Sequence, residues 1–185
     1  MYKSLALLTI ALLTGCQILG PGPTRGQALP PIELEVPEKA AEKVYLGLTG
    51  ESGTFGFDDI RGDVLVVEVF NTYCPYCQKA APMYNRLFDR LRQSAIAGRA
   101  KMIGIAGGNP EFAAETFEDK YSVLFPVFAD PQSKNQKALG VSGVPHLTVI
   151  DLRGSQATVM FTEEGGVNLD VQSIIDRIGR ALGVE

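Results

Sequence analysis

Two cysteines separated by two residues carry the clearest chemical signal in this sequence. Cys74-Pro75-Tyr76-Cys77 lies between an apolar run, residues 64–70, and a stretch whose apolar residues recur at helical spacing. A cysteine at the start of a helix faces unpaired amide N–H groups and the positive end of the helix dipole, which favour the thiolate. We therefore expect Cys74 to be the attacking sulfur, and Cys77, one turn further in, to resolve a mixed disulfide.

Other uses of a cysteine pair fit the sequence less well. A zinc site needs four ligands, and the only histidine in the chain is His146. Covalent haem attachment needs a histidine directly after the second cysteine, where Gln78 stands. A structural disulfide across two residues would constrain the unfolded chain little. We expect no bound metal and no cofactor.

Glu68 is the second candidate, six residues before Cys74 in the middle of the most apolar run. Burial of an ionised carboxylate is costly, so the pKa of Glu68 should rise there. Beneath the cysteine pair, Glu68 is expected to take and return the Cys77 proton as catalytic base and acid. The alternative is a glutamate at the edge of the strand that points to water.

The elements that must position these residues follow from hydrophobic periodicity. An alternation of strands and helices predicts an α/β fold with a mixed central sheet, helices on both of its faces and an N-terminal β-hairpin. The predicted strands are 44–48 and 54–57 (the hairpin), 64–70, 101–106, 125–129, 146–152 and 157–162. One predicted helix follows Cys74 and contains Pro82. The other predicted helices cover residues 111–121, 133–139 and 169–182.

Composition and charge limit the possible functions. The chain has 185 residues, 45% hydrophobic and 21% charged, as expected of one globular domain. Its net charge of −4 provides no basic surface, so we expect no nucleic-acid partner. One histidine and three cysteines exclude a disulfide-dense scaffold and a histidine-rich metal site.

The N-terminus looks like a targeting segment. Residues 5–13 are almost continuously apolar, too short to span a bilayer but typical of a signal peptide. The ending Leu13-Thr14-Gly15-Cys16 resembles a bacterial lipobox. This predicts a lipoprotein signal peptide at 1–15, a lipidated Cys16 with a Pro/Gly-rich tether through residue 41, and a folded domain at 42–185.

The same resemblance predicts where the protein resides. A lipid on Cys16 would anchor it to a membrane of the bacterial cell envelope, with the folded domain facing the periplasm. Gln17, rather than aspartate, follows the cysteine and favours the outer membrane where two membranes exist. Lipidation also accounts for the odd cysteine and leaves Cys74 and Cys77 as a pair.

These motifs together resemble the thioredoxin-like superfamily. Glu68, the Cys74–Cys77 pair, Pro82 and Val144-Pro145 stand in the order of that fold's buried acid, redox pair, helix proline and cis-proline. Segments similar to the TlpA/ResA-type envelope proteins of the peroxiredoxin-like branch are 59–63, 125–130 and 140–145. The resemblance implies a thioredoxin fold and a cis Val144–Pro145 bond.

The resemblance also implies an activity, thiol–disulfide exchange with the cysteines of substrate proteins and with a separate redox partner. Pro75, Tyr76, Val144 and Pro145 would contact the partner chain. Tyr73 and Ala80 stand where the branch often has tryptophan and glutamate, which weakens any specific link to apocytochrome c. The alternatives are a redox-inert lipoprotein that binds a partner in this groove, or a copper-handling one using Cys74, Cys77 and His146.

Overall fold

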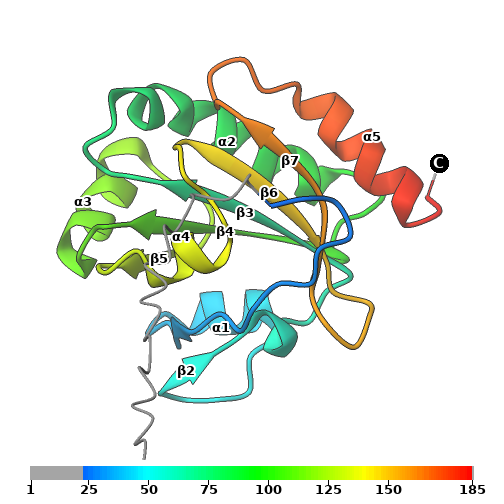
Figure 1. Ribbon diagram of the computed structural model, residues 1–185, viewed down its shortest axis with the longest axis horizontal. Coiled ribbons are helices and arrows are strands. Elements are labelled where there is room, and N and C mark those ends of the chain that lie inside the picture. The colour runs from blue at the N-terminus through cyan, green and yellow to red at the C-terminus, as the bar shows by residue number, and fades with distance from the viewer. Residues whose placement is uncertain (1–22, 185) are drawn as a thin grey trace, which may run out of the picture.

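The computed structural model describes residues 23–184, a mixed sheet covered by helices (Figure 1). The strands are β1 Leu34–Glu35, β2 Thr54–Phe55, β3 Val64–Phe70, β4 Ala100–Gly107, β5 Val127–Asp130, β6 His146–Asp151 and β7 Thr158–Glu164. The helices are α1 Ala40–Leu46, α2 Pro75–Gln93, α3 Glu111–Tyr121, α4 Lys134–Ala138 and α5 Val171–Ala181, with a 3-10 turn at Phe57–Asp59. The predicted signal peptide and Cys16 lie outside the described residues.

The central sheet has the order β5-β4-β3-β6-β7, with β3 in the middle. β3 runs parallel to β4 and antiparallel to β6. All seven residues of β3 are buried, because helices cover both faces of the sheet. The predicted strand 64–70 and helix 111–121 match β3 and α3 residue for residue, and the predicted alternation of strands and helices is confirmed.

Two apolar cores lie on opposite faces of this sheet. One core joins Val64, Val66 and Phe70 of β3 to α2, α3 and α5. The other joins Leu65, Val67 and Val69 to Leu46 of α1, to the N-terminal segment and to Leu139. Successive side chains of a strand point to opposite faces, so each residue of β3 belongs to one core only. Glu68 is therefore on the face that α2 covers.

The N-terminal extension differs from the prediction in its strands. A two-stranded antiparallel sheet is present, but β2 pairs with β1, with Leu34 opposite Phe55. Residues 44–48, predicted as the first strand of a hairpin, instead form the end of α1 and the turn after it. Leu46 is fully buried against the second core. Leu46 can be buried from a helix as well as from a strand. The short apolar pattern around it in the sequence therefore does not distinguish a helix from a strand.

Part of the predicted tether also belongs to the folded domain. Ile32 and Leu34 are buried, and the backbone of Gly26 and Leu29 donates hydrogen bonds to β7 and the residue before it. The folded domain therefore begins well before residue 42. No helix within residues 23–184 is long and apolar enough to cross a membrane.

Candidate active site

The Cys74–Cys77 segment lies at the junction of β3 and α2, at the carboxyl end of the central strand. Cys74 is the N-cap of α2 with extended backbone, φ −75° and ψ 118°, and Pro75 occupies the first helical position. Proline is favoured there because the first N–H groups of a helix have no intrahelical partner. Cys74 is half-buried and Cys77 fully buried, and both are thiols.

A network of asparagine contacts holds the turn before Cys74. Asn71 donates from Nδ2 to the Gly107 carbonyl (2.9 Å) and accepts the Tyr73 N–H (3.0 Å). Asn109 accepts the buried Thr72 N–H at 2.9 Å. These bonds tie the turn to the end of β4 and so fix where Cys74 emerges. Neither Asn71 nor Asn109 was predicted from the sequence, although an Asn directly after a strand favours such a turn.

The loop before β6 approaches the first cysteine. The Val144–Pro145 peptide bond is cis, and the Cys74 thiol lies 3.8 Å from the Val144 carbonyl oxygen. Pro145 is buried, whereas Tyr76 in the first turn of α2 is 67% exposed. The sequence-predicted residues Pro75, Tyr76, Val144 and Pro145 thus surround Cys74 from two separate elements.

The two thiols have opposite pKa shifts. Burial is the largest single effect on Cys74 and opposes its ionisation, but the backbone N–H groups of Cys77 and Tyr76 and the Cys77 thiol outweigh it. The pKa of Cys74 is therefore lowered. Burial is also the largest effect on Cys77, and with the nearby Cys74 and Glu68 it raises the pKa of Cys77 strongly. The half-buried sulfur of Cys74 is therefore more readily ionised than the buried sulfur of Cys77.

Glu68 lies on the same face of the sheet as Cys77 and is 2% exposed. Its Oε1 has no hydrogen-bond partner among the described residues, and burial raises the pKa of its carboxyl well above the usual value. Tyr84, about two helical turns beyond Cys77 on α2, has a buried hydroxyl that likewise lacks a partner in residues 23–184. Burial, followed by the charges of Glu68 and Cys77, raises the pKa of Tyr84.

We call Glu68, Cys77 and Tyr84 the buried polar cluster. Buried polar groups usually have partners, and the exceptions gather at functional sites. The sequence predicted Glu68 beneath the cysteine pair. In the structure its side chain is buried on the face of the sheet that α2 covers, and its charge contributes to the raised pKa of Cys77. The sequence did not predict a role for Tyr84, because one tyrosine among the apolar positions of a helix looks like an ordinary core residue.

His146 lies on the other side of the sheet. It is in phase with Thr148 and Ile150 of β6, which face the second core, whereas Cys77 belongs to the first. The structure therefore does not bring together the three residues considered as copper ligands. Within residues 23–184, no three His, Cys, Asp or Glu side chains are grouped so that they could hold a metal.

The loop after β7 closes the site over α2 and gives the first prediction. A Cβ on Gly166 would lie 2.5 Å from the Ala80 Cβ and 2.7 Å from Cε2 of Tyr84. Gly166→Ala should therefore lower the free energy of unfolding, measured in urea, by about 1–3 kcal/mol through overpacking. Gly143→Ala is the matched control, because a Cβ there meets nothing within 4 Å. Equal stability of the two variants would contradict the close packing.

Comparisons with known proteins agree with this geometry. The AhpC/TSA family model matches residues 26–165. The chain is 25% identical over 117 residues to the thiol-disulfide oxidoreductase ResA of Halalkalibacterium halodurans, covering 63% of each protein. It is 25% identical over 96 residues to ResA of Geobacillus thermodenitrificans, covering 52% of this chain and 53% of that protein. The matched region thus spans between about half and less than two thirds of the length of these relatives.

A solved structure supports the fold. The putative thiol:disulfide interchange protein DsbE from Chlorobium tepidum superposes with a TM-score of 0.65 at 20% identity, covering 87% of this chain and 99% of that one. The similarity confirms the predicted thioredoxin-like fold. The family model spans most of the chain, including Cys74, Cys77 and the cis-proline loop. The chain therefore belongs to the AhpC/TSA family of thioredoxin-like proteins.

Proposed function

We propose that this protein is a thiol–disulfide oxidoreductase that exchanges electrons with the cysteines of other proteins. One observation carries the proposal. A half-buried thiol with a lowered pKa caps a helix and lies 3.8 Å from the Val144 carbonyl, while its partner thiol is buried one turn inside with a raised pKa. Thiol–disulfide exchange needs this asymmetry, because one sulfur must react with the substrate first and the other must remain a thiol until the mixed disulfide has formed.

In the reducing direction, the Cys74 thiolate attacks a substrate disulfide. One substrate sulfur leaves as a thiolate, and a mixed disulfide joins Cys74 to the other. Cys77 then loses its proton to the Glu68 carboxylate and attacks the Cys74 sulfur. The second substrate sulfur leaves as a thiolate. Both substrate thiolates then take up a proton, one returned by Glu68 and one from water. Two electrons have moved, so the Cys74–Cys77 disulfide is formed and the substrate disulfide is reduced to two thiols.

Glu68 suits the proton step because it is buried on the same face as Cys77 and has no competing partner among the described residues. Its raised pKa brings a carboxylic acid closer to the pH at which it must both accept and return a proton. The oxidising direction is the reverse of the same steps. The direction of flow depends on the redox partner.

The partner chain would dock beside Cys74. Val144 and Pro145 present backbone to an extended segment, and the exposed Pro75 and Tyr76 contact it from α2. The relatives named ResA are thiol-disulfide oxidoreductases by name, which supports protein cysteines as the substrate class. A separate, still unidentified protein would restore the Cys74–Cys77 pair after each exchange.

The proposed location is the cell envelope. A lipid on Cys16 would hold the domain at a membrane surface, with residues 17–22 leading to the folded part that begins near residue 26. Disulfides form and persist in oxidising compartments outside the cytoplasm, so disulfide substrates would be available to Cys74 and Cys77 there. Gln17 favours the outer membrane where two are present.

Peroxide reduction is the competing activity, because the sequence resembles the peroxiredoxin-like branch of the thioredoxin-like superfamily. A peroxidatic cysteine lies in a Pro-x-x-x-Thr/Ser-x-x-Cys loop. Counting back from Cys74, Val67 and Asn71 occupy the proline and hydroxyl positions. The absence of both residues favours disulfide exchange.

A single-turnover experiment tests the proposal. Fully reduced protein, freed of small thiols, is mixed with insulin and quenched with a maleimide, and the modified cysteines are counted by mass spectrometry. We expect one insulin disulfide to be reduced for each Cys74–Cys77 disulfide formed. A parallel sample receives hydrogen peroxide in place of insulin. Faster oxidation by peroxide, with no transfer to insulin, would overturn the proposal in favour of a peroxidase.

A further inference from the structure

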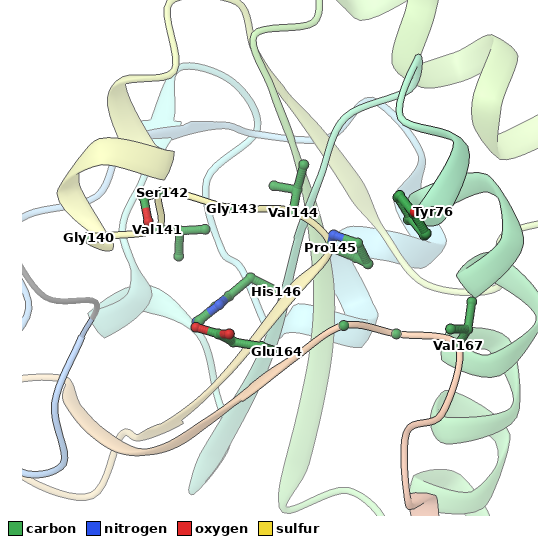
Figure 2. A pocket seen from close by; sticks show the side chains of 12 residues that line it. Tyr76, Gly140, Val141, Ser142, Gly143, Val144, Pro145, His146, Glu164 and Val167 are labelled. Carbon is green, nitrogen blue, oxygen red and sulfur yellow. The ribbon is translucent and has the colours of Figure 1, made fainter. Parts of the chain in front are cut away.

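A cavity of about 440 Å³ opens between the loop before β6 and the loop after β7 (Figure 2). We call it the loop pocket, lined by residues 140–146 and 164–167 and by Tyr76. Four of these residues are glycines, Gly140, Gly143, Gly165 and Gly166. At Gly143 and Gly165 a Cβ would meet no atom within 4 Å, so the walls are open there. The Gly165 N–H donates to the Pro145 carbonyl at 3.1 Å, which ties the two walls together.

Two ionisable side chains on neighbouring strands face this pocket. His146 begins β6 and Glu164 ends β7, and they are direct partners in the antiparallel register. Figure 2 shows their side chains next to each other on the side of the pocket away from Tyr76. His146 is 6% exposed, and its Nε2 has no hydrogen-bond partner within residues 23–184. Glu164 is exposed at the rim.

The charge of the loop pocket is negative. Burial lowers the pKa of His146, against a smaller opposing effect of Glu164, so the imidazole is neutral near pH 7. The Glu164 carboxylate then remains uncompensated, because no lysine or arginine of the described chain lines the pocket. Glu164 offers its carboxylate oxygens as hydrogen-bond acceptors, and the neutral imidazole beside it adds no positive charge. An ammonium or guanidinium group supplies the matching donors and the opposite charge.

The pocket is also within reach of the reacting sulfur. Val144 lines it, and the Val144 carbonyl is 3.8 Å from the Cys74 thiol. Tyr76, in the turn between the two cysteines, forms the opposite wall. If a substrate chain docks along Val144 with its cysteine at Cys74, the side chain of a residue next to that substrate cysteine can enter the loop pocket.

We propose that the loop pocket binds a lysine or arginine side chain of the substrate, with Glu164 and His146 as its specificity-determining residues. This inference rests on the proposed exchange function and adds to it a substrate class, disulfides with a basic residue near the reacting cysteine. Glu164 and His146 act on recognition, whereas Cys74 carries out the exchange with Cys77 and Glu68, which lie on the face of the sheet that α2 covers.

Three synthetic peptides test the inference. Each carries one cysteine as a mixed disulfide with thionitrobenzoate, in an otherwise neutral sequence with lysine, alanine or glutamate at a neighbouring position, which is varied on both sides of the cysteine. Attack by Cys74 on the peptide sulfur releases coloured thionitrobenzoate, and Cys77 then releases the reduced peptide. Stopped-flow absorbance gives the second-order rate constant for each peptide.

With the wild-type protein, we expect the lysine peptide to react about three- to fivefold faster than the alanine peptide at the best position, with the glutamate peptide slowest. Added salt should reduce this preference, because the pair is partly exposed. In Glu164→Gln, the lysine and glutamate peptides should react at the same rate. Glu163→Gln is the matched control, because Glu163 pairs with Arg177 of α5 and does not line the pocket. That variant should keep the wild-type preference.

The outcomes separate the two proposals. If wild-type protein reacts with all three peptides at one rate at every position, the inference is wrong and the exchange function stands. If Glu163→Gln loses the preference as completely as Glu164→Gln, the overall charge of the surface selects the substrate, and the loop pocket is excluded. If no peptide reacts, the exchange function itself fails, and the inference falls with it.

Discussion

Cys74→Ser should lose multiple-turnover insulin reduction by at least about a thousandfold, because a serine hydroxyl neither ionises near neutral pH nor forms a disulfide. Cys74 is the half-exposed sulfur at the helix N-cap, so no other described thiol can replace it as the attacking group. The assay follows the precipitation of insulin chains with dithiothreitol as reductant, after subtraction of the rate without protein.

Cys77→Ser should lose turnover as well, but with a different product. Cys74 still attacks, and the mixed disulfide accumulates because the resolving sulfur is missing. A non-reducing gel should show a covalent adduct with insulin in Cys77→Ser and none in Cys74→Ser. Urea unfolding of both variants serves as the control for folding. Full insulin reduction by folded Cys74→Ser would refute the proposed roles of both cysteines.

Glu68→Gln should slow the resolution of the mixed disulfide by about a hundredfold at pH 7, because glutamine cannot accept the Cys77 proton. Burial raises the pKa of Cys77, so the thiol ionises little unless a nearby base takes its proton. Rapid quenching of the reaction with insulin should show the mixed disulfide forming at the wild-type rate and decaying slowly. Unchanged decay would exclude Glu68 from the proton transfer.

The same substitution should change how stability depends on pH. The pKa of Glu68 is higher in the folded protein than its ordinary value of 4.5. Between these two pKa values the folded state binds more protons than the unfolded state, so the free energy of unfolding falls as pH rises. The loss can reach about 1.4 kcal/mol for each pH unit in this window. Glu68→Gln removes this dependence and should be the more stable protein at pH 8.

Urea unfolding between about pH 5 and pH 8 measures this difference. Both proteins should carry Cys74→Ser, because the lowered pKa of Cys74 would add a slope of opposite sign at higher pH. Parallel curves for the two proteins would mean that Glu68 titrates as it does in the unfolded chain, in contradiction to its burial. A variant that is both more stable and slower would indicate that the buried acid is retained for its chemistry.

The local sequence was sufficient to predict the central part of the site. Val64–Phe70 is apolar along its whole length, and helical spacing follows Cys74, so the strand, the helix and the cysteine pair between them were predictable. The period of two along a strand also puts Glu68 on a single face. These features were predictable because they depend on residues close together in the sequence, which is the range that hydrophobic periodicity covers.

Other features required the tertiary structure, because they depend on contacts between distant segments. Residues 44–48 form the end of a helix and the turn after it, since the strand partner of Thr54–Phe55 comes from residues 34–35. Tyr84 joins Glu68 only because α2 covers that face of β3. His146 and Glu164 meet through strand register, on the face opposite Cys77. Local spacing determined which residues could react, and the packing of sheet and helices decided which of them meet.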